Sequence, residues 1–201
     1  MSDQRRAAVL KAATRVIARD GLTASTASIA AEAGLSVGSL FNYFPTKTAL
    51  INALYLHLKR DLAGAVVEPS IPPGPLRGRA WEAWRRWIRW GAADPDKQRV
   101  LMLIDVSHEL TGRTREDGVE AMQGADSLFA EARPGGPFAD QPLEFLVATV
   151  GAMAATTMEA VAREPEEFES RCSAGFAAVW AAIVISERPS GSDADERRSR
   201  P

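Results

Sequence analysis

The fold of this chain is decided by one stretch, Thr26-Ala-Ser-Ile-Ala-Ala-Glu-Ala-Gly-Leu-Ser-Val-Gly-Ser-Leu-Phe-Asn-Tyr-Phe-Pro-Thr-Lys47. Ser25 or Thr26 can cap a first short helix that has an apolar edge. Gly34 stands where a left-handed residue often ends a helix, and Ser36 can cap the helix that follows. Two short helices joined by a tight turn that contains glycine are the parts of a helix-turn-helix DNA reader. The stretch therefore predicts a DNA-binding module.

The second of these short helices has two sides of different character. Pro45 and Thr46 end it and open the next helix. The outward side is the one that would meet DNA. The predicted core residues are Leu40, Phe41 and Phe44, and the predicted outward residues are Val37, Gly38, Ser39, Asn42 and Tyr43.

Length and composition are compatible with this prediction. A chain of 201 residues suits one large or two small domains, and an apolar fraction of 46% is enough to fill a core. No uninterrupted apolar run approaches the roughly 20 residues of a membrane helix, and the N-terminus has no apolar signal region. The single cysteine, Cys172, fits a reducing compartment and lies on an apolar stripe, as a small buried residue would. We therefore expect a cytoplasmic protein without a membrane segment.

Charge is distributed unevenly along the chain, although the formal net charge is only -2. Residues 1–65 hold eight basic and four acidic side chains, so the remainder is acidic on balance. Taken alone, a random division of solvated faces explains this asymmetry equally well. Together with the helix-turn-helix, a basic head on an acidic body favours a phosphate-binding module attached to a regulatory domain.

Nearly all of the remaining sequence has helical periodicity. Apolar stripes predict a first helix that ends before Gly21 and a long fourth helix that includes Leu50 and Leu62. Four prolines between Glu68 and Pro75 interrupt any helix and mark a hinge or loop. Further helices are predicted at residues 76–93, 96–110, 114–132, 141–163 and 165–186.

The sequence therefore predicts an all-α fold of about nine helices. We expect an N-terminal three-helix helix-turn-helix domain at residues 1–65 and a larger C-terminal helical domain for ligand binding and dimerisation at residues 66–188. The tail at residues 189–201 is rich in Ser, Asp, Glu and Arg, and this composition predicts disorder.

The first 65 or so residues resemble the DNA-binding domain of the TetR/AcrR family of transcriptional regulators. The family pattern contains a glycine, a Thr/Ser-x-x-x-Ile-Ala segment, an Ala-Gly-Val-Ser-x-Gly-x-Leu-Tyr-x-Tyr-Phe segment and a lysine. Phe41 replaces the usual tyrosine, so a hydroxyl that could bond phosphate is absent. The rest of the chain matches the family only in its helical architecture. The matching residues are Gly21, Ser25-Thr-Ala-Ser-Ile29-Ala30, Ala33-Gly-Leu-Ser-Val-Gly-Ser-Leu-Phe-Asn-Tyr-Phe44 and Lys47.

The resemblance implies DNA contacts for particular side chains. Val37 and Gly38 would open the recognition helix in the major groove, with Val37 against a thymine methyl group. Asn42 would read an adenine edge, whereas Ser39 and Tyr43 would bond phosphates. Because no Arg or Gln stands near the start of this helix, we expect appreciable reliance on DNA shape and backbone contacts. The remaining predicted contacts are Lys47, Thr26 and Ser36, of which the last two could equally be plain helix caps.

Four tryptophans recur within the segment Trp81-Glu-Ala-Trp-Arg-Arg-Trp-Ile-Arg-Trp90. At about 100° per residue they spread over half of a helix, with Trp84 and Trp87 predicted to lie deepest and Trp81 and Trp90 beside them. In the family that the chain resembles, the helix after the hinge lines an inducer cavity. This helix is therefore expected to form an aromatic wall for a flat or apolar ligand, and a Trp-rich core without a cavity is the alternative.

Later helices supply the other predicted ligand contacts. They are chosen from inward stripes, where Met and Phe are more often core residues than ligand contacts. A histidine beside Glu109 near a helix end is likewise more often a surface residue. The candidates beyond Trp84 and Trp87 are Met102, His108, Phe129, Met153 and Thr157.

The last two long helices predict a dimer surface. Helices at about 141–163 and 165–186 are apolar around much of their circumference and carry small residues that permit close helix approach. A second copy would cover the excess apolar surface in a four-helix bundle, and the dimers of the family are similar. A charged residue at Ala178 or Val179 is expected to break the dimer.

We therefore expect a ligand-responsive transcriptional regulator, by default a repressor, that binds a pseudo-palindromic operator in double-stranded DNA as a homodimer. A small apolar or aromatic effector would release it. An enzyme is not expected, because two histidines and one cysteine provide neither a metal cluster nor a triad, and no cofactor is expected. The main alternative is a helical small-molecule-binding protein that does not bind DNA specifically, and the third is a protein-interaction adaptor.

Overall fold

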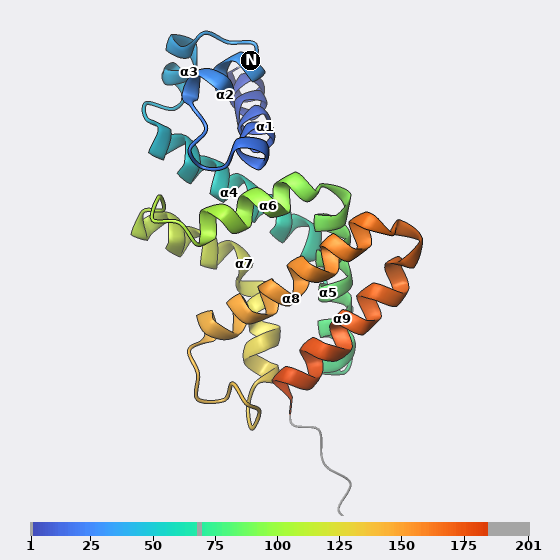
Figure 1. Ribbon diagram of the computed structural model, residues 1–201. Coiled ribbons are helices and arrows are strands. Elements are labelled where there is room, and N and C mark those ends of the chain that lie inside the picture. Colours follow the sequence, from blue (N-terminus) through green and yellow to red (C-terminus); the bar gives the residue numbers. More distant parts are fainter. Residues whose placement is uncertain (1, 68–69, 185–201) are drawn as a thin grey trace, which may run out of the picture.

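The structure of the chain is a computed structural model that describes residues 2–67 and 70–184. All regular structure in these residues is helical, which confirms the predicted all-α class (Figure 1). The elements are α1 (Ser2–Asp20), α2 (Thr26–Glu32), α3 (Val37–Tyr43), α4 (Lys47–Val66), α5 (Leu76–Ala93), α6 (Pro95–Asp105), α7 (Gly112–Ala132), α8 (Leu143–Arg163), the 3-10 turn η1 (Pro165–Glu167) and α9 (Phe168–Ile183).

Helices α1, α2 and α3 form a small head at one end of the molecule (Figure 1). Side chains start its two short helices: the Ser25 hydroxyl accepts from the Ser28 amide at 3.0 Å, and the Ser36 hydroxyl accepts from the Ser39 amide at 3.1 Å. Gly34 between these helices has a φ of 67°, a left-handed conformation that glycine adopts without a steric penalty. The predicted helix-turn-helix is therefore present.

The core of the head is apolar and closely packed. Val16, Ile17, Leu40 and Leu50 have no exposed surface, and Phe44 is 2% exposed. Burying an apolar side chain of this size contributes about 1.5–3 kcal/mol to folding. These side chains belong to one buried cluster that joins α3 to α1 and to the first half of α4.

Helix α4 connects the head to the rest of the molecule without a break in the core. It packs against α1 and also against α5, α6 and α7. One cluster of buried side chains extends from Leu10 in the head through Leu58 to Trp90 and Leu128. The domain boundary predicted at residue 65 thus falls near the end of a helix that serves both parts, and it stays a prediction.

The side chain of Asn52 ties α4 to the segment between α6 and α7. Its amide nitrogen donates to the Glu109 carbonyl at 2.8 Å, and its amide oxygen accepts from the Thr111 backbone N–H at 3.0 Å. The same nitrogen donates to the Thr48 carbonyl within α4. The hydrogen bonds of this largely buried amide fix the position of α4 relative to the segment between α6 and α7.

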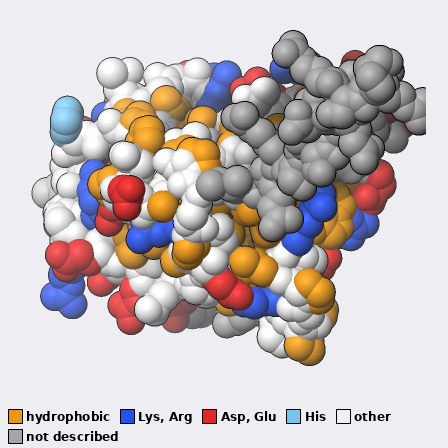
Figure 2. Space-filling view, turned by 90° about the horizontal axis from the view of Figure 1, so that it is seen from below, with side chains coloured by type: hydrophobic (Ala, Val, Ile, Leu, Met, Phe, Trp, Pro, Cys, Tyr) orange, Lys and Arg blue, Asp and Glu red, His pale blue; other side chains and the backbone are white. Residues whose placement is uncertain are grey.

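The body is built from α5, α7, α8 and α9, with α6 lying between this bundle and the head (Figure 1). Helices α8 and α9 are joined by η1, lie side by side and pack on α5. Their buried side chains, which include Leu146, Val150, Cys172 and Ile183, form a second core cluster. The body therefore has a core of its own in addition to the one it shares with the head. Its surface, seen from below, carries hydrophobic side chains among charged ones (Figure 2).

Helix α8 is the one helix of the described residues that could cross a membrane by length and composition alone, with 21 residues. The core helix of a folded protein meets the same criterion. Leu146, Val150 and Met158 on α8 are buried in the second core cluster, so one side of the helix is occupied by packing within the chain.

Two predicted helices differ from the structure by more than two residues at an end. The helix predicted at 96–110 ends at Asp105, because the Ser107 hydroxyl donates to the Ile104 carbonyl at 2.8 Å and accepts from the Glu109 amide at 3.2 Å. Such side-chain bonds compete with helical ones. The helix predicted at 165–186 opens with η1, and its α-helical part ends at Ile183. The tail predicted to be disordered at 189–201 lies outside the described residues.

Candidate DNA-binding surface and internal cavity

Helix α3 presents the predicted recognition surface on the outside of the head. Val37, Gly38 and Asn42 are exposed, and Ser39 is half-buried. The Ser36 hydroxyl lies 2.9 Å from the Ser39 hydroxyl in addition to capping the helix. A short helix with an exposed N-terminal end, held by a tight turn on a rigid head, has the form that enters the major groove.

Phe41 corrects the sequence prediction, which placed it in the core. Its side chain is 39% exposed and stands one helical turn from Val37, which is 38% exposed. Because each residue turns by about 100° around a helix, Phe41 cannot share the core face of Leu40, which is fully buried. The outer face of α3 therefore carries an apolar pair, Val37 and Phe41, of the kind that contacts thymine methyl groups.

Two of the predicted phosphate contacts also hold the head together. Tyr43, predicted to point outward, is half-buried and packs against the core of the head. The Lys47 ammonium donates to the Leu22 carbonyl at 2.6 Å, which ties the start of α4 to the loop before α2. An ammonium has three hydrogens, so Lys47 can also meet a phosphate. Thr26 is the first residue of α2, and Ser25 rather than Thr26 caps that helix.

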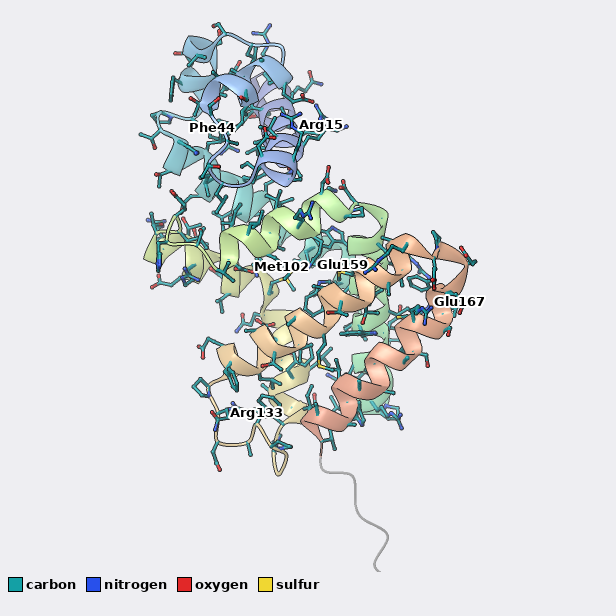
Figure 3. The ribbon with its side chains drawn as sticks, in the orientation of Figure 1. Arg15, Phe44, Met102, Arg133, Glu159 and Glu167 are labelled. Carbon is teal, nitrogen blue, oxygen red and sulfur yellow. The ribbon has the colours of Figure 1, made fainter. Side chains whose placement is uncertain are left out.

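Several basic side chains on the outside of the head are paired with acids. Arg15, labelled on the outer side of α1 in Figure 3, lies 2.7 Å from Glu32, and Arg19 lies 2.8 Å from Asp20. Exposed ion pairs contribute little to stability. They neutralise Arg15 and Arg19 locally, so the basic excess of the head comes from its other basic side chains.

The body contains a cavity of about 570 Å³. All six helices from α4 to α9 contribute side chains to its walls, and most of these side chains are apolar. The volume lies in the range of about 300–1,000 Å³ that is typical of small-molecule sites. The aromatic rings in its walls include those of Trp84, Trp87, Phe129, Phe176 and Trp180.

The cavity walls include some of the predicted ligand contacts. Trp84, Trp87, Met102 and Phe129 line the cavity. Met102 is 40% exposed and lies at the edge of the cavity, on the side of α6 that faces α8 in Figure 3. The aromatic wall predicted for the Trp-rich helix therefore coincides with a cavity.

The other predicted contacts lie outside this cavity. His108 is exposed in the turn after α6. Met153 packs against the second core cluster, and the Thr157 hydroxyl donates to the Met153 carbonyl at 2.9 Å. Helix α8 turns a different face to the cavity, the one with Val147 and Gly151. The sequence showed that α8 was apolar on several sides but not which side met the cavity.

The four tryptophans of α5 differ in burial, and their order of burial is not the one that the sequence predicted. Trp90 is 9% exposed and donates its indole N–H to the Asp61 carboxylate on α4 at 2.8 Å. Trp84 is 3% exposed and donates to the Cys172 carbonyl at 3.0 Å. Trp87, predicted among the deepest, is half-buried. The two predicted roles of this helix, aromatic cavity wall and Trp-rich core, are both present. Trp90 belongs to the core, and Trp87 belongs to the cavity wall.

Two polar atoms on cavity-lining residues have no hydrogen-bond partner within residues 2–67 and 70–184. They are the indole nitrogen of Trp87, a donor, and the amide oxygen of Gln98, an acceptor. Gln98 is only 8% exposed. A buried polar atom without a partner costs about 1–3 kcal/mol, and a bound molecule with matching groups would recover part of this cost.

Charged side chains line the part of the cavity between α4, α6 and α7. The Lys59 ammonium lies 3.3 Å from the Asp105 carboxylate. Burial raises the pKa of Asp126 on α7 to about 6, although Lys59 opposes this shift. Burial also raises the pKa of Tyr55 well above its usual value. This part of the cavity is thus polar, whereas the part near α9 is aromatic and aliphatic.

Gln98 and Asp126 are cavity residues that the sequence reasoning missed. Asp126 stands within a helical stripe of α7 that also contains Met122 and Phe129, and all three line the cavity. A carboxyl group inside an apolar stripe is a detectable signal, because charged side chains rarely face a core without a partner. Gln98 offers no comparable signal.

The outer face of α9 is made of small residues. Ala174, Ala177, Ala178 and Ala181 are exposed. Val179 is 2% exposed and belongs to the second core cluster, so the predicted dimer test at this residue would disturb folding instead. Ala178 alone of the two proposed positions lies on the surface.

Residues 9–54, which extend from α1 into α4, match the family model of bacterial regulatory proteins of the tetR family. A solved tetR family transcription regulator from Shewanella sp. PV-4 is 26% identical and has a TM-score of 0.78, with 90% of this chain and 99% of that chain covered. Residues 9–54 are therefore a TetR-family DNA-binding domain. Within it, α2 and α3 form the helix-turn-helix.

Other TetR regulators share the fold over nearly the whole chain. A transcription regulator from Marinobacter aquaeolei VT8 has a TM-score of 0.78 at 20% identity, with 92% of this chain and 97% of that chain covered. LfrR from Mycobacterium smegmatis, solved in complex with proflavine, has a TM-score of 0.63 at 20% identity, with 90% and 98% covered. The arrangement of head and body is therefore that of complete TetR regulators.

Proposed function

We propose that this TetR regulator is a repressor that binds a pseudo-palindromic operator as a homodimer and leaves it when a small, largely apolar molecule occupies the cavity. The observation that carries the proposal is that the same helices line the cavity and hold the head. Tyr55, Lys59 and Leu62 of α4 line the cavity, and α4 begins at Lys47 against the head. A protein that acts on operators works where bacterial DNA is, in the cytoplasm.

Helix α6 supplies the second connection between cavity and head. Gln98, Leu101 and Met102 line the cavity, and α6 packs against α1. Asn52 joins the segment after α6 to α4 by two hydrogen bonds, so a displacement of one helix would be transmitted to the other. A ligand that displaces them would change the spacing of two recognition helices. Ligand and DNA then weaken each other by the same factor, and a coupling of about 1–3 kcal/mol gives about 5–150-fold relief.

The small, exposed residues of α9 support the homodimer. Ala174, Ala178 and Ala181 follow one another at helical spacing, and short side chains let the helix of a second copy approach closely. A twofold dimer presents two copies of α3 to two half-sites about one helical turn apart or more. The proflavine complex of LfrR supports a small molecule as the effector, since that protein has the same fold.

The DNA-binding part is tested by selecting bound sequences from random double-stranded DNA. The expected result is an enriched palindrome whose binding weakens as salt rises. Asn42→Ala is expected to lose discrimination at one position of each half-site, about 1–3 kcal/mol. Gln123→Ala, which removes an exposed amide on α7, serves as the matched control. No enrichment at low salt would contradict the proposal and favour a helical ligand-binding protein that does not read DNA.

The dimer is tested separately by sedimentation or light scattering. Ala178→Glu is expected to give monomers that bind the selected DNA weakly. Ala130→Glu places the same charge on an exposed alanine of α7 and should leave the dimer intact. A dimeric Ala178→Glu variant that binds DNA normally would move the interface elsewhere.

A further inference from the structure

The carboxyl group of Asp126 lies on the wall of the cavity without a partner. It is half-buried on α7, between Met122 and Phe129 on the same stripe. Among the described residues, it makes neither a hydrogen bond nor an ion pair. A carboxylate that is partly removed from water and left unpaired costs folding free energy, so its presence in an apolar wall calls for an external partner.

The charged groups around Asp126 leave it uncompensated. Lys59 on α4 is the basic group that acts on Asp126, and its ammonium is already 3.3 Å from Asp105 on α6. Arg115 on α7 is exposed and donates to the backbone carbonyl of Asp105 at 3.5 Å. The other ionisable groups of the lining are Tyr55 on α4 and Glu144 on α8. Carboxyl groups therefore outnumber basic groups in the cavity walls.

Gln98 adds a second acceptor without a partner. Its amide oxygen is buried, and no donor among the described residues reaches it. The lining of the cavity also includes Trp84, Trp87 and Trp180, and indole rings attract a cation when water is excluded. A ligand with an apolar skeleton and one positively charged, hydrogen-donating group matches these features. An anionic ligand would be repelled by the carboxyl groups of the lining.

We propose that the effector of this cavity is an amphiphilic cation, an aromatic or aliphatic body that carries one amine, whose charge pairs with Asp126. This inference rests on the proposed function, in which the cavity holds the effector. The amine replaces the missing partner of Asp126, and the apolar body fills the part of the cavity near α9. A neutral or anionic molecule of the same shape leaves Asp126 unpaired and binds more weakly.

The test uses three probes with one skeleton: 4-phenylbutylamine, 4-phenylbutanol and 4-phenylbutanoate. Binding to the full-length dimer is measured by calorimetry and by the fluorescence of the cavity tryptophans. The amine is expected to bind at least about tenfold more tightly than the alcohol, a difference of about 1.4 kcal/mol. Asp126→Asn should remove this advantage and leave the affinity for the alcohol unchanged. Glu120→Gln, which makes the same charge change on an exposed residue of α7, should have no effect.

The pH dependence provides a second readout. Protonation of Asp126 removes its charge, so the affinity for the amine should fall as the pH is lowered through about 6. This fall should be absent in Asp126→Asn. Glu144 and Asp105, the other carboxyl groups of the lining, are present in both proteins. They therefore do not contribute to the difference between the two pH profiles of amine affinity.

The outcomes separate the inference from the function on which it rests. If the alcohol or the carboxylate binds as well as the amine, and Asp126→Asn changes nothing, the cationic class is wrong while the cavity remains a binding site. If none of the three binds at millimolar concentration, the ligand-binding function fails as well. Release of the selected operator by the amine, but not by the alcohol at the same concentration, supports both.

Discussion

The head and the body of this protein are built in opposite ways. In the head, Ser25, Ser36 and Thr46 cap successive helices through their side chains. In the body, α5 and α8 begin after Pro75 and Pro142 with no side-chain cap. Local sequence thus defines the short helices of the head, whereas the long helices of the body depend on packing against one another.

The two regions also differ in how completely they satisfy their interior groups. In the head, buried Thr14 donates its hydroxyl to the Leu10 carbonyl at 3.0 Å. In the body, Trp87 and Gln98 each carry a buried polar atom for which the described residues provide no partner, and a cavity lies beside them. The buried hydroxyl of the head is thus paired, whereas the body combines a cavity with buried polar atoms that lack a partner.

The largest expected effect is on the core of the head. Leu40→Ala removes a fully buried side chain and should lower the free energy of unfolding by about 2–5 kcal/mol. Val37→Ala on the exposed face of the same helix should change it by less than about 0.5 kcal/mol. Urea denaturation measures both. A small loss for Leu40→Ala would mean that the head is less rigid than its packing indicates.

A gain in stability is expected when the unpaired carboxyl group of the body is neutralised. The pKa of Asp126 is raised to about 6 in the folded state, so the folded protein holds this proton more tightly than the unfolded chain does. Stability is therefore lost as pH rises from about 4 through 6. Asp126→Asn avoids this loss and should be more stable than the parent at pH 7 by up to about 3 kcal/mol.

The same variant should show little difference at pH 4, where Asp126 is protonated in the folded protein. Thermal unfolding of parent and variant at both pH values measures this change, and Glu120→Gln provides the exposed control. An equal difference at the two pH values would show that the effect of Asp126→Asn is not caused by ionisation.

Two tryptophans of α5 allow a paired and an unpaired indole N–H to be compared within one helix. Trp84→Phe removes the indole hydrogen bond to the Cys172 carbonyl, which lies within α9, and should cost about 0.5–1.5 kcal/mol beyond the loss of ring area. Trp87→Phe removes an indole N–H that has no partner in the described structure, so the polar part of its cost should be absent. Calorimetric unfolding of the two variants gives the difference. Equal costs would indicate that Trp87 has a partner such as an ordered water.

The smallest expected effects distinguish two glycines of the head. Gly34→Ala forces a side chain into a left-handed conformation, and the cost should be about 1 kcal/mol. Gly38 lies in α3 with open space around it, so Gly38→Ala should stabilise the helix by about 0.5–1 kcal/mol. If Gly38 permits close approach to DNA, the second variant should be more stable in unfolding assays yet bind the operator more weakly.

The sequence predicted the head in detail because its signals are local. Gly34 and Ser36 specify a turn and a cap wherever the chain is placed. The prediction places Phe41 in the core because nothing in the sequence shows which side of a very short helix faces outward. Hydrophobicity alone does not separate a core residue from an apolar residue on an exposed helix face.

The cavity could be predicted only in part, because its shape depends on how distant helices pack. Trp84 and Phe129 were found from inward stripes, whereas Met153 and Thr157 lie on a different face of α8. Periodicity identifies the apolar faces of such a helix but not the neighbour that each face meets. Whether the amide oxygen of Gln98 has a hydrogen-bond partner likewise depends on the residues that surround it, and the sequence alone does not show this.

The core shared by head and body has a consequence for how such regulators can be recombined. Leu58 and Leu62 of α4 lie in one buried cluster with Trp90 and with Leu101 of α6. A chimaera that takes residues 1–65 from another relative would therefore replace the α4 residues of this cluster. The residues of α5 and α6 that pack against them would stay unchanged and would no longer match. Exchange of operator specificity, in the laboratory or in evolution, should succeed when α1, α4 and α6 are inherited together, or when only the exposed residues of α3 change.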